Sequence, residues 1–400
     1  MLKGKTVLVG VSGGIAAYKM ANCVSMLLKQ GADVHVIMTE NACNFITPIT
    51  FETLTGNKCM VDTFDRNFKF DVAHISLAKA ADVFLIAPAT ADVIGKMANG
   101  IADDMLTTTA LACRCPKIIA PAMNTAMYQN NIVQDNLRKL QHYGFTVIKP
   151  DSGHLACGDT GEGKMPSEEI LVDYVIHEIA HEKDMVGKNV IVSAGPTQEA
   201  IDPVRYVTNH STGKMGYEIA KAAARRGAKV TLVSGRTSLK APLFVETINV
   251  VSAGDMFEAF KSRFKDNDII IKAAAVADYK PKTVAENKIK KKDGDMSIAL
   301  ERTDDIIGTL GKTKRDNLFL CGFSMETEHM LENSKAKLEK KNLDMIIANN
   351  VKVKGAGFGT DTNVVTLITK DEIKELPIMS KEDVADEIFN NILANRKGIV

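Results

Sequence analysis

The segment Thr6-Val-Leu-Val-Gly-Val-Ser-Gly-Gly14 gives the strongest indication of the fold. Residues 6–10 form a continuous, mainly apolar run, which is typical of a strand buried on both faces of a sheet. Two glycines then precede a helical pattern at 15–30, and Gly31 marks where that helix should stop. A strand, a tight glycine turn and a helix in this order predict the start of a parallel α/β sheet.

The same alternation continues along the chain and restarts at Asn189. In the first half we expect strands at 33–38, 83–87, 117–120 and 146–148, and a helix after Pro48. In the second half we expect strands at 190–193, 230–234, 269–272, 318–322, 345–348 and 364–368, and helices at 217–226, 253–264 and 381–394. The pattern predicts an α/β protein with two doubly wound, Rossmann-like domains. We place these domains at 1–178 and 189–400, with a polar linker at 179–188.

Composition excludes several classes of protein. A chain of 400 residues exceeds what one hydrophobic core normally supports, and its 45% apolar and 25% charged residues are ordinary for a globular protein. The net charge of +1 gives no drive toward nucleic acid or a membrane surface, and no long apolar stretch predicts a transmembrane span. Seven scattered cysteines without a Cys-x-x-Cys pair favour free thiols in a reducing cytoplasm over disulfides or structural zinc.

The ends of three predicted strands in the first half carry residues suited to a flat, phosphorylated ligand. A helix that starts directly after a glycine turn can bind an anion through its backbone amides. This turn fits neither G-x-G-x-x-G nor a Walker motif, so a purely structural turn is an equal alternative. The candidate cofactor-binding residues are Gly10, Ser12, Gly13, Gly14, Thr39, Ala87, Pro88, Ala89 and Thr90.

Three further residues of the first half are candidates for catalysis. Asn124, in Pro121-Ala-Met-Asn-Thr-Ala-Met-Tyr128, directly follows the strand at 117–120, where open α/β sheets bind ligands. A capping Asn is the simpler alternative. His74 precedes a short predicted helix, although a single His is more often structural. Cys157 lies in the glycine-rich stretch 153–166, which suits either a mobile lid or a flexible surface loop with an inert thiol.

Together these segments resemble the flavin-dependent cysteine decarboxylases. The matching motifs are Gly10-Val-Ser-Gly-Gly14, the His before its helix, Pro121-Ala-Met-Asn124 followed by Met127, and Leu155-Ala-Cys-Gly158. Tyr128 stands where the family more often has Trp. The resemblance implies a flavodoxin-like domain with FMN between the glycine turn and residues 87–90. It also implies that His74 and Asn124 contact the terminal cysteine of the substrate, and that Cys157 donates a proton.

The resemblance also implies why a flavin is required. A saturated carboxylate does not readily lose CO2, because the carbanion that remains has nowhere to delocalise. In the family, FMN first takes two electrons from the thiol side chain, and the resulting C=S group accepts the charge left behind by CO2. The electrons return after protonation, so no net redox change results.

The second half contains a different constellation. Residues 194–216 form a long insert rich in hydroxyls and turn formers that ends at a helix N-terminus, where Ser211, Thr212 and Gly213 offer an anion cradle. Gly213-Lys214 suggests a Walker loop, but the position five residues before the glycine is Thr208, so we reject that interpretation. Asp278 follows the strand at 269–272 and places one carboxylate at the edge of the sheet.

A lysine-rich segment follows Asp278. Six lysines lie between 280 and 292 against one acid, Glu286. Such a block is either a solvated charged hairpin or a flap that clamps a polyphosphate with mobile point charges. Farther along, Phe323 could stack on a base, and Lys337 and Lys341 present two cations on one helix face.

The second half resembles the phosphopantothenate–cysteine ligases over nearly its whole length. The most specific match is Ala194-Gly-Pro-Thr-Gln-Glu199 followed by Asp202-Pro-Val-Arg-Tyr206 and Asn209 to Gly216. In bacterial members, CTP with Mg2+ activates the substrate as an acyl-cytidylate that the amine of cysteine attacks. The resemblance places Asn209 beside the acyl carbonyl as an oxyanion donor. The implied nucleotide contacts are Ala273, Ala274, Asp278, Lys288, Asp305, Ile306, Ile307, Phe323, Lys337 and Lys341. The residues themselves do not distinguish CTP from ATP, and they identify no metal ligand.

In this order on one chain, the two resemblances imply two consecutive steps of coenzyme A biosynthesis. The substrates would be 4′-phosphopantothenate, cysteine and CTP, and the product of ligation, 4′-phosphopantothenoylcysteine, would be decarboxylated to 4′-phosphopantetheine. The families also imply trimeric decarboxylase and dimeric ligase contacts, and hence a dodecamer. One alternative is a non-catalytic flavin-binding regulator, but such a protein has no need to retain His74, Asn124 and Cys157 together. Another is a flavin oxidoreductase attached to an NAD-type domain, but no G-x-G-x-x-G follows Ser193 in this sequence.

Overall fold

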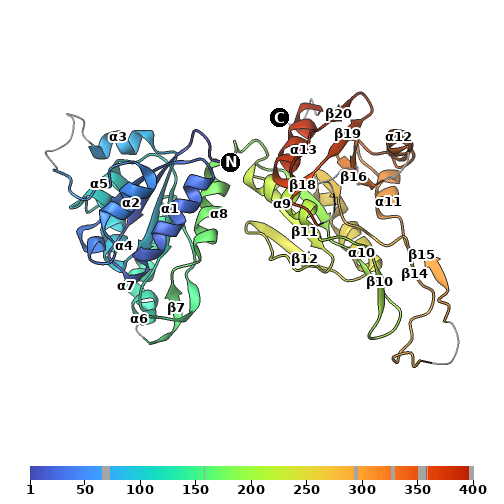
Figure 1. Ribbon diagram of the computed structural model, residues 1–400, viewed down its shortest axis with the longest axis horizontal. Coiled ribbons are helices and arrows are strands. Elements are labelled where there is room, and N and C mark those ends of the chain that lie inside the picture. The colour runs from blue at the N-terminus through green and yellow to red at the C-terminus, as the bar shows by residue number, and fades with distance from the viewer. Residues whose placement is uncertain are drawn as a thin grey trace. The chain divides into compact units, whose positions relative to one another are not determined.

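The computed structural model describes residues 1–64, 73–156, 158–291, 296–325, 329–349, 357 and 359–395 (Figure 1). The chain divides into two compact units, Met1–Glu182 and Lys183–Val400. The dividing point lies within the segment 179–188, which we expected to form the linker. The two units are described separately.

The first unit is built on a five-stranded parallel sheet. Its strands are β1 (Thr6–Val11), β2 (Asp33–Met38), β3 (Val83–Ala89), β4 (Lys117–Pro121) and β5 (Phe145–Val147). Their order is β2-β1-β3-β4-β5, the flavodoxin-like doubly wound order. The expected fold class is therefore confirmed for this unit, and the carboxyl ends of β1 and β3 lie side by side at the switch point.

Helices cover both faces of this sheet. In α1, Met20, Cys23, Val24 and Leu27 are buried at i, i+3, i+4 and i+7, which is the stripe of an amphipathic helix packed on a sheet. One face of the sheet carries η1 (Ile15–Lys19), α1 (Met20–Lys29), α2 (Pro48–Thr55) and α8 (Glu168–Ile179). The other carries α3 (Ala73–Ala80), α4 (Ala91–Ala98), α5 (Met105–Ala112) and α7 (Asn131–His142). Shorter elements are η2 (Glu40–Asn44) and α6 (Thr125–Gln129).

The second unit contains an eight-stranded sheet. Its strands are β8 (Asn189–Ala194), β11 (Lys229–Ser234), β12 (Val245–Asn249), β13 (Ile269–Lys272), β16 (Phe319–Met325), β17 (Met345–Asn349), β19 (Val365–Thr369) and β20 (Ile373–Glu375). The order is β12-β11-β8-β13-β16-β17-β19-β20. The first six strands are parallel in the 3-2-1-4-5-6 order of a Rossmann sheet, which confirms the expected class. The switch point lies between β8 and β13.

The helices of the second unit also cover both faces. On one face lie α9 (Lys214–Arg225) and α13 (Lys381–Asn395), and on the other lie α10 (Ala253–Arg263), η3 (Phe264–Asp266), α11 (Ile306–Lys312) and α12 (Met330–Lys340). Three small antiparallel pairs complete the unit: β9 (Gln198–Ala200) with β10 (Tyr206–Thr208), β14 (Tyr279–Pro281) with β15 (Leu300–Arg302), and β18 (Thr362–Asn363) with β21 (Met379–Ser380).

Three expectations need correction. The glycine-rich stretch that we expected to be an irregular lid forms a β-hairpin, β6 (Asp151–His154) with β7 (Thr160–Lys164). The predicted helix at 15–30 begins as the 3-10 turn η1, and α1 starts only at Met20. The strand expected at 364–368 pairs antiparallel with β17, so the second sheet is mixed at this edge.

Two candidate active sites

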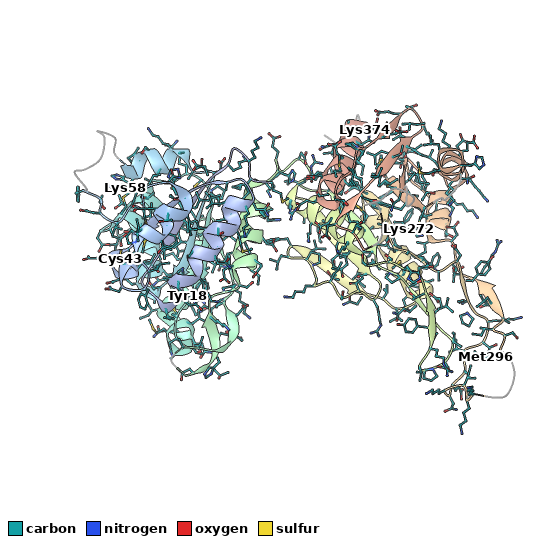
Figure 2. The ribbon with its side chains drawn as sticks, in the orientation of Figure 1. Tyr18, Cys43, Lys58, Lys272, Met296 and Lys374 are labelled. Carbon is teal, nitrogen blue, oxygen red and sulfur yellow. The ribbon has the colours of Figure 1, made fainter. Side chains whose placement is uncertain are left out.

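A cavity of about 450 Å³ lies at the carboxyl edge of the first sheet. It is bounded by the turn after β1, the residues after β3 and β4, and the hairpin β6–β7. This is the position at which open α/β sheets bind ligands, and the volume is in the usual range for cofactor sites. The lining residues are Gly13, Gly14, Ile15, Ala16, Tyr18, Lys19, Thr90, Ala91, Ala122, Met123, Asn124, Met127, His154, Leu155, Ala156, Gly163, Lys164 and Met165. Tyr18 is marked in Figure 2.

The glycine turn is held in place by Ser12. The buried Ser12 hydroxyl donates to the Pro88 carbonyl (2.7 Å) and accepts from the Thr90 backbone N–H (3.0 Å), which ties the end of β1 to the end of β3. Thr90 in turn caps α4 by accepting from the Val93 N–H. Gly13 and Gly14 form the cavity wall, so a side chain on Gly14 would project into space that a ligand needs. The small residues therefore suit a flat, phosphorylated ring, and FMN fits this donor set.

Asn124 lines the same cavity, and hydrogen bonds hold both ends of its amide. Its Oδ1 accepts from the Ala126 N–H (2.8 Å), which caps α6, and its Nδ2 donates to the Asp159 carboxylate (2.5 Å) at the turn of the hairpin. Asn124 therefore caps a helix, as the simpler alternative predicted, and also lines the cavity. Its amide is oriented from two sides, and such orientation is what precise binding of a substrate carboxylate requires.

The hairpin can lie against α6 only because it carries glycine at the contact. A Cβ on Gly163, whose φ is +134°, would lie 2.3 Å from the Met123 carbonyl oxygen. The Gly163 carbonyl also accepts a hydrogen bond from the Met123 N–H (3.0 Å). The hairpin thus covers one side of the cavity and brings His154, Leu155 and Lys164 to its wall.

The other predicted residues of the first site lie elsewhere. Gly10, Ala87, Pro88 and Ala89 belong to the buried strands behind the cavity, and Thr39 caps η2 by accepting from the Ala42 N–H. His74 is half-buried on α3, which packs against α5, and it does not line this cavity. Cys157 lies outside the described residues. Its role, like the roles of His74 and Asn124, stays a prediction.

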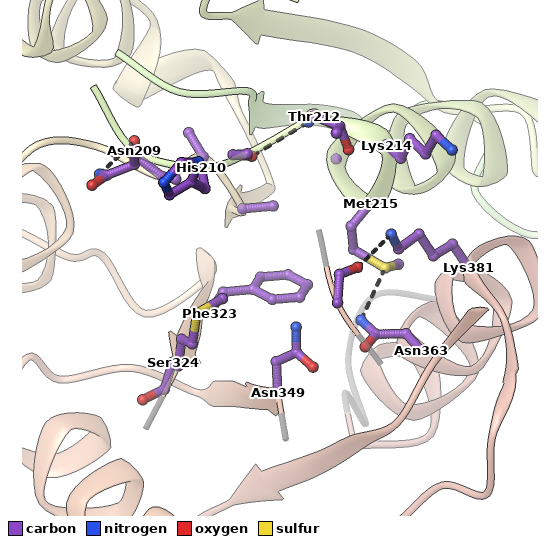
Figure 3. Close-up of a pocket in the computed structure, with 18 of the residues that line it drawn as sticks. Asn209, His210, Thr212, Lys214, Met215, Phe323, Ser324, Asn349, Asn363 and Lys381 are labelled. Atoms are coloured by element: carbon purple, nitrogen blue, oxygen red, sulfur yellow. Dashed lines mark hydrogen bonds between the residues drawn. The ribbon is translucent and has the colours of Figure 1, made fainter. Parts of the chain in front are cut away.

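A second cavity, of about 510 Å³, lies at the carboxyl edge of the sheet in the second unit (Figure 3). Phe323 points into it from β16, opposite the loop that carries Asn209 and His210. Five of the predicted residues line it: Asn209, Ala273, Ala274, Asp278 and Phe323. The remaining lining residues are His210, Ser211, Thr212, Gly213, Lys214, Met215, Gly216, Ala275, Ser324, Met325, Asn349, Gly357, Asn363 and Lys381.

The amide of Asn209 is anchored to the end of β13. Its Nδ2 donates to the carbonyls of Ala275 (3.1 Å) and Val276 (3.2 Å). The loop that carries those carbonyls is fixed in turn, because the Thr197 hydroxyl accepts from the Ala277 N–H (3.0 Å) and the Ala275 N–H donates to the Gly195 carbonyl (3.0 Å). Asn209 therefore lies at the switch point between β8 and β13, on a loop that these hydrogen bonds hold in place. Asp278 lines the same cavity.

The predicted anion cradle lies at the N-terminus of α9. Ser211, Thr212 and Gly213 line the cavity there, which confirms their predicted position at a helix start. A Cβ on Gly216 would lie 2.7 Å from the Ser193 carbonyl oxygen, so only glycine lets α9 approach β8 this closely. Lys214 donates to the Asp361 carboxylate (2.7 Å), and the buried Lys381 donates to the Gly357 carbonyl (3.0 Å). Amides, hydroxyls and ammonium groups thus surround this end of the cavity, as anion binding requires.

The other predicted nucleotide contacts gather on the opposite face of the sheet, outside the cavity lining. Lys341 forms an ion pair with Asp305 (2.9 Å), and Asp305 caps α11 by accepting from the Gly308 N–H (3.1 Å). Burial, the largest single influence, opposes ionisation of Asp305, but the hydrogen bonds from Lys341 and the Gly308 N–H, with the charges of Lys341 and Lys272, together lower the Asp305 pKa. Ile306 and Ile307 are buried in the core beneath this pair. Lys337 lies on the exposed side of α12.

Lys288 is exposed in the segment that joins β14 to β15. The base of this segment is fixed, because the buried Asp202 carboxylate accepts from the Ile289 N–H (3.1 Å) and from the Arg205 guanidinium (2.8 Å). The residues 292–295 lie outside the described part of the chain. A solvated hairpin and a polyphosphate flap both remain compatible with this arrangement.

Sequence reasoning missed several polar residues of the second cavity. Asn349 is the last residue of β17, and Asn363 in β18 directly precedes the apolar run of β19; an amide at the end of an apolar strand is a usable signal. Lys381, the first residue of α13, gave no local signal, because only the fold brings α13 to the cavity. In the first site, His154 and Lys164 were hidden in the stretch that we had expected to be a loop.

Within the described ranges, no group of three or more His, Cys, Asp or Glu side chains could hold a metal ion. The described cysteines, Cys23, Cys43, Cys59, Cys113, Cys115 and Cys321, are all free thiols. No helix in the same residues is both long enough and apolar enough to cross a membrane.

Comparisons with known proteins agree with this division into two units. Residues 1–180 match the family model Flavoprotein, and residues 185–395 match the DNA/pantothenate metabolism flavoprotein C-terminal domain. The chain is 50% identical over 401 residues to the coenzyme A biosynthesis bifunctional protein CoaBC of Bacillus subtilis (strain 168), which covers 99% of this chain and 98% of that protein.

Two solved structures align with one unit each. The crystal structure of the C-terminal domain of a coenzyme A biosynthesis bifunctional protein CoaBC is 45% identical, and the match covers 53% of this chain and 96% of that chain, with a TM-score of 0.46. The FMN-dependent cysteine decarboxylase SpaF is 32% identical, and the match covers 44% of this chain and 99% of that chain, with a TM-score of 0.39.

Proposed function

The chain belongs to the family of coenzyme A biosynthesis bifunctional proteins, and from this premise we propose how its residues divide the two reactions. It is a bifunctional enzyme, a phosphopantothenate–cysteine ligase and a phosphopantothenoylcysteine decarboxylase, which catalyses two consecutive steps of coenzyme A biosynthesis. The observation that carries the proposal is the presence of two cavities at two separate switch points. One is built from small and apolar residues, and the other from amide, hydroxyl and ammonium groups.

We assign decarboxylation to the first cavity. Gly13, Gly14 and Thr90 would hold FMN, which supplies the two-electron chemistry when bound. Asn124 would bind the carboxylate of the substrate through its amide, whose orientation is set by the Ala126 N–H and by Asp159. The hairpin β6–β7 would exclude water from the reacting cysteine, and Cys157, which follows β6 in the sequence, would deliver the proton. The free thiols of the described cysteines suit a reducing compartment, and we propose the cytoplasm.

We further propose that decarboxylation requires an assembly of several copies. His74 does not line the cavity of its own chain, whereas its expected role is to touch the substrate. An assembly such as a trimer would resolve this difference, because α3 of one copy could cover the cavity of the next and bring His74 to the substrate there. Two variants with impaired decarboxylation, His74→Asn and Asn124→Ala, should then regain decarboxylase activity when co-expressed in mixed assemblies. Mixed assemblies that stay inactive, with both variants folded and FMN bound, would contradict this arrangement.

We assign ligation to the second cavity and divide it between the two faces of the sheet. On the α9 face, the cradle at Ser211–Gly213 would bind the phosphate of 4′-phosphopantothenate. On the α11 and α12 face, Asp305, Lys337 and Lys341 would bind the nucleotide, whose base would reach over the strand ends to Phe323 in the cavity on the α9 side. The two substrates would meet above the end of β13, where Asn209 would donate to the oxygen of the activated acyl group.

CTP and Mg2+ are the proposed co-substrate and metal. The similarity of segment 194–216 to the bacterial ligases supports CTP, and Mg2+ would arrive with the nucleotide and help neutralise its phosphates. The test is to incubate the purified protein with 4′-phosphopantothenate, cysteine, Mg2+ and either CTP or ATP, and to identify the products by mass. We expect 4′-phosphopantetheine, CMP and CO2 with CTP. Equal turnover with ATP, or turnover without a divalent cation, would contradict this part of the proposal.

A further inference from the structure

Lys272 is the last residue of β13, at the switch point of the second sheet (Figure 2). The three residues before it are buried isoleucines, and the residues after it, Ala273 and Ala274, line the second cavity. A lysine at the end of an apolar central strand has to place its ammonium at the edge where ligands bind.

The register of the sheet fixes the direction of the Lys272 side chain. Lys272 pairs with Gly322 of β16, and residues paired across parallel strands point to the same face. A Cβ on Gly322 would lie 2.9 Å from Cδ1 of Ile307, so that face is the one covered by α11. The Lys272 side chain therefore extends toward the start of α11, where the Asp305–Lys341 ion pair lies, and Gly322 leaves room beside it.

The charges around Lys272 do not pair with it. Within the described residues, the Lys272 ammonium forms no hydrogen bond and no ion pair, and the nearby charged groups are Lys341 and Lys337 from α12, Asp278 after β13, and Asp305 before α11. Asp305 is already paired with Lys341. Burial and then repulsion from Lys341 lower the Lys272 pKa. A half-buried, unpaired ammonium among other cations costs stability, so its presence calls for an anion that completes the site.

We propose that Lys272 is a further nucleotide-binding residue of the ligase, whose ammonium contacts the phosphates of the bound nucleoside triphosphate. This inference rests on the proposed ligase function, because Lys337, Lys341 and Asp305 are the proposed nucleotide contacts. A lysine is a compact point charge without preferred bidentate geometry, which suits a mobile polyphosphate chain. Before the nucleotide binds, the same charge destabilises the site, so Lys272 couples nucleotide binding to the stability of the second unit.

Substitution of Lys272 should change binding and stability in opposite directions. Lys272→Met keeps the length of the side chain and removes the charge, whereas Lys272→Arg keeps the charge. Lys312→Met is the matched control. Lys312 lies in α11, on the face of the sheet toward which Lys272 points, but it is exposed and lines neither cavity. All three are made in the full-length protein; decarboxylation of 4′-phosphopantothenoylcysteine reports whether the first unit is folded, and circular dichroism reports whether the second is.

In calorimetric titration with Mg-CTP, we expect Lys272→Met to weaken binding on the order of tenfold or more, as for loss of one hydrogen bond to a charged group. Titration with inorganic pyrophosphate should show the same loss, and Lys312→Met should show none. Without nucleotide, Lys272→Met should unfold at an equal or higher temperature than the parent protein, and it should gain less from added Mg-CTP.

A second signature is proton uptake. An anion beside Lys272 raises its lowered pKa, so at a pH between the pKa values of the free and bound states the parent protein should take up protons when Mg-CTP binds, and Lys272→Met should take up fewer. Titrations in buffers of different ionisation enthalpy measure this number. Unchanged Mg-CTP affinity in Lys272→Met, or weakened binding of 4′-phosphopantothenate alone, would overturn the inference and leave the ligase assignment standing. A parent protein that neither binds nor uses any nucleotide would overturn the ligase assignment as well.

Discussion

The two cavities occupy the same place in two similar sheets, yet the residues that line them differ in chemistry. In the first unit, the switch point between β1 and β3 carries glycine, alanine and one oriented amide beside a glycine-rich hairpin. In the second, the switch point between β8 and β13 is surrounded by amides, hydroxyls, lysines and aspartates. The topology therefore decides where each reaction takes place, and the residues on the strand ends decide which reaction it is.

The difference follows from what each substrate brings. A flavin carries its own electron acceptor, so the first site needs a flat slot, a way to hold the substrate carboxylate, and exclusion of water. A nucleotide-dependent ligase has to gather several negative charges in one place, so the second site needs cations and helix amides around both reacting groups. A substitution in one site should leave the reaction at the other site of the same chain unchanged, so that second reaction serves as an internal reference.

The largest effect is expected for Asn209→Asp. This change replaces the amide that bonds the carbonyls of Ala275 and Val276 with a carboxylate that those carbonyls repel, and it removes the proposed oxyanion donor. Ligase turnover should fall on the order of a hundredfold or more, as for loss of one oxyanion donor. Stopped assays of 4′-phosphopantothenoylcysteine formation measure it. Nucleotide affinity and decarboxylation should stay near those of the parent protein, and normal ligation would remove Asn209 from the site.

A smaller effect is expected for Asn124→Ala in the first unit. Loss of one hydrogen bond to a charged group is worth roughly 1.5–3 kcal/mol, so the kcat/KM of decarboxylation should fall about ten- to hundredfold. Asn130→Ala is the control, since Asn130 caps α7 in the same way, by accepting from the Ile132 N–H (2.9 Å), and lines neither cavity. If the two variants lose the same activity, Asn124 acts only as a helix cap.

The smallest effect is a pH dependence confined to the second site. Burial, and then repulsion from Lys341, lower the Lys272 pKa, so this ammonium loses its proton as pH rises through the lowered value. Nucleotide binding is therefore supported fully below that pH and weakens above it, so the KM for CTP should rise toward the roughly tenfold limit expected for loss of this charge contact. The alkaline rise should disappear in Lys272→Met. A rise of equal size in that variant would assign the pH dependence to another group.

The fold was largely predictable because its strands have a strong local signature. The ranges 33–38 and 269–272 match β2 and β13 residue for residue, since each is an uninterrupted run between clear stop signals. The hairpin β6–β7 was not predictable, because glycines at Gly153, Gly161 and Gly163 hide the alternation by which a strand is recognised. Gly161 and Gly163 are required by close contacts with Thr125 of α6 and with the Met123 carbonyl before it, and such contacts leave no trace in local sequence.

The sites divide in the same way. Asn124, Asn209 and Asp278 lie directly after strands or on the insert between them, so their approach to the sheet edge follows from chain order. Lys272 and Lys381 could not be assigned, because their surroundings come from tertiary packing. The direction of Lys272 depends on its register with Gly322, and Lys381 reaches the cavity only because α13 packs beside α9.

The most direct test of the central claim, that one chain carries two separate active sites, is product analysis of the two single-site variants by mass spectrometry. Parent protein, Asn209→Asp and Asn124→Ala are each given 4′-phosphopantothenate, cysteine and Mg-CTP, or 4′-phosphopantothenoylcysteine alone. We predict that Asn124→Ala accumulates 4′-phosphopantothenoylcysteine, and that Asn209→Asp forms little of it but decarboxylates it when supplied. A single substitution that abolishes both reactions in a folded, FMN-containing protein would contradict the account.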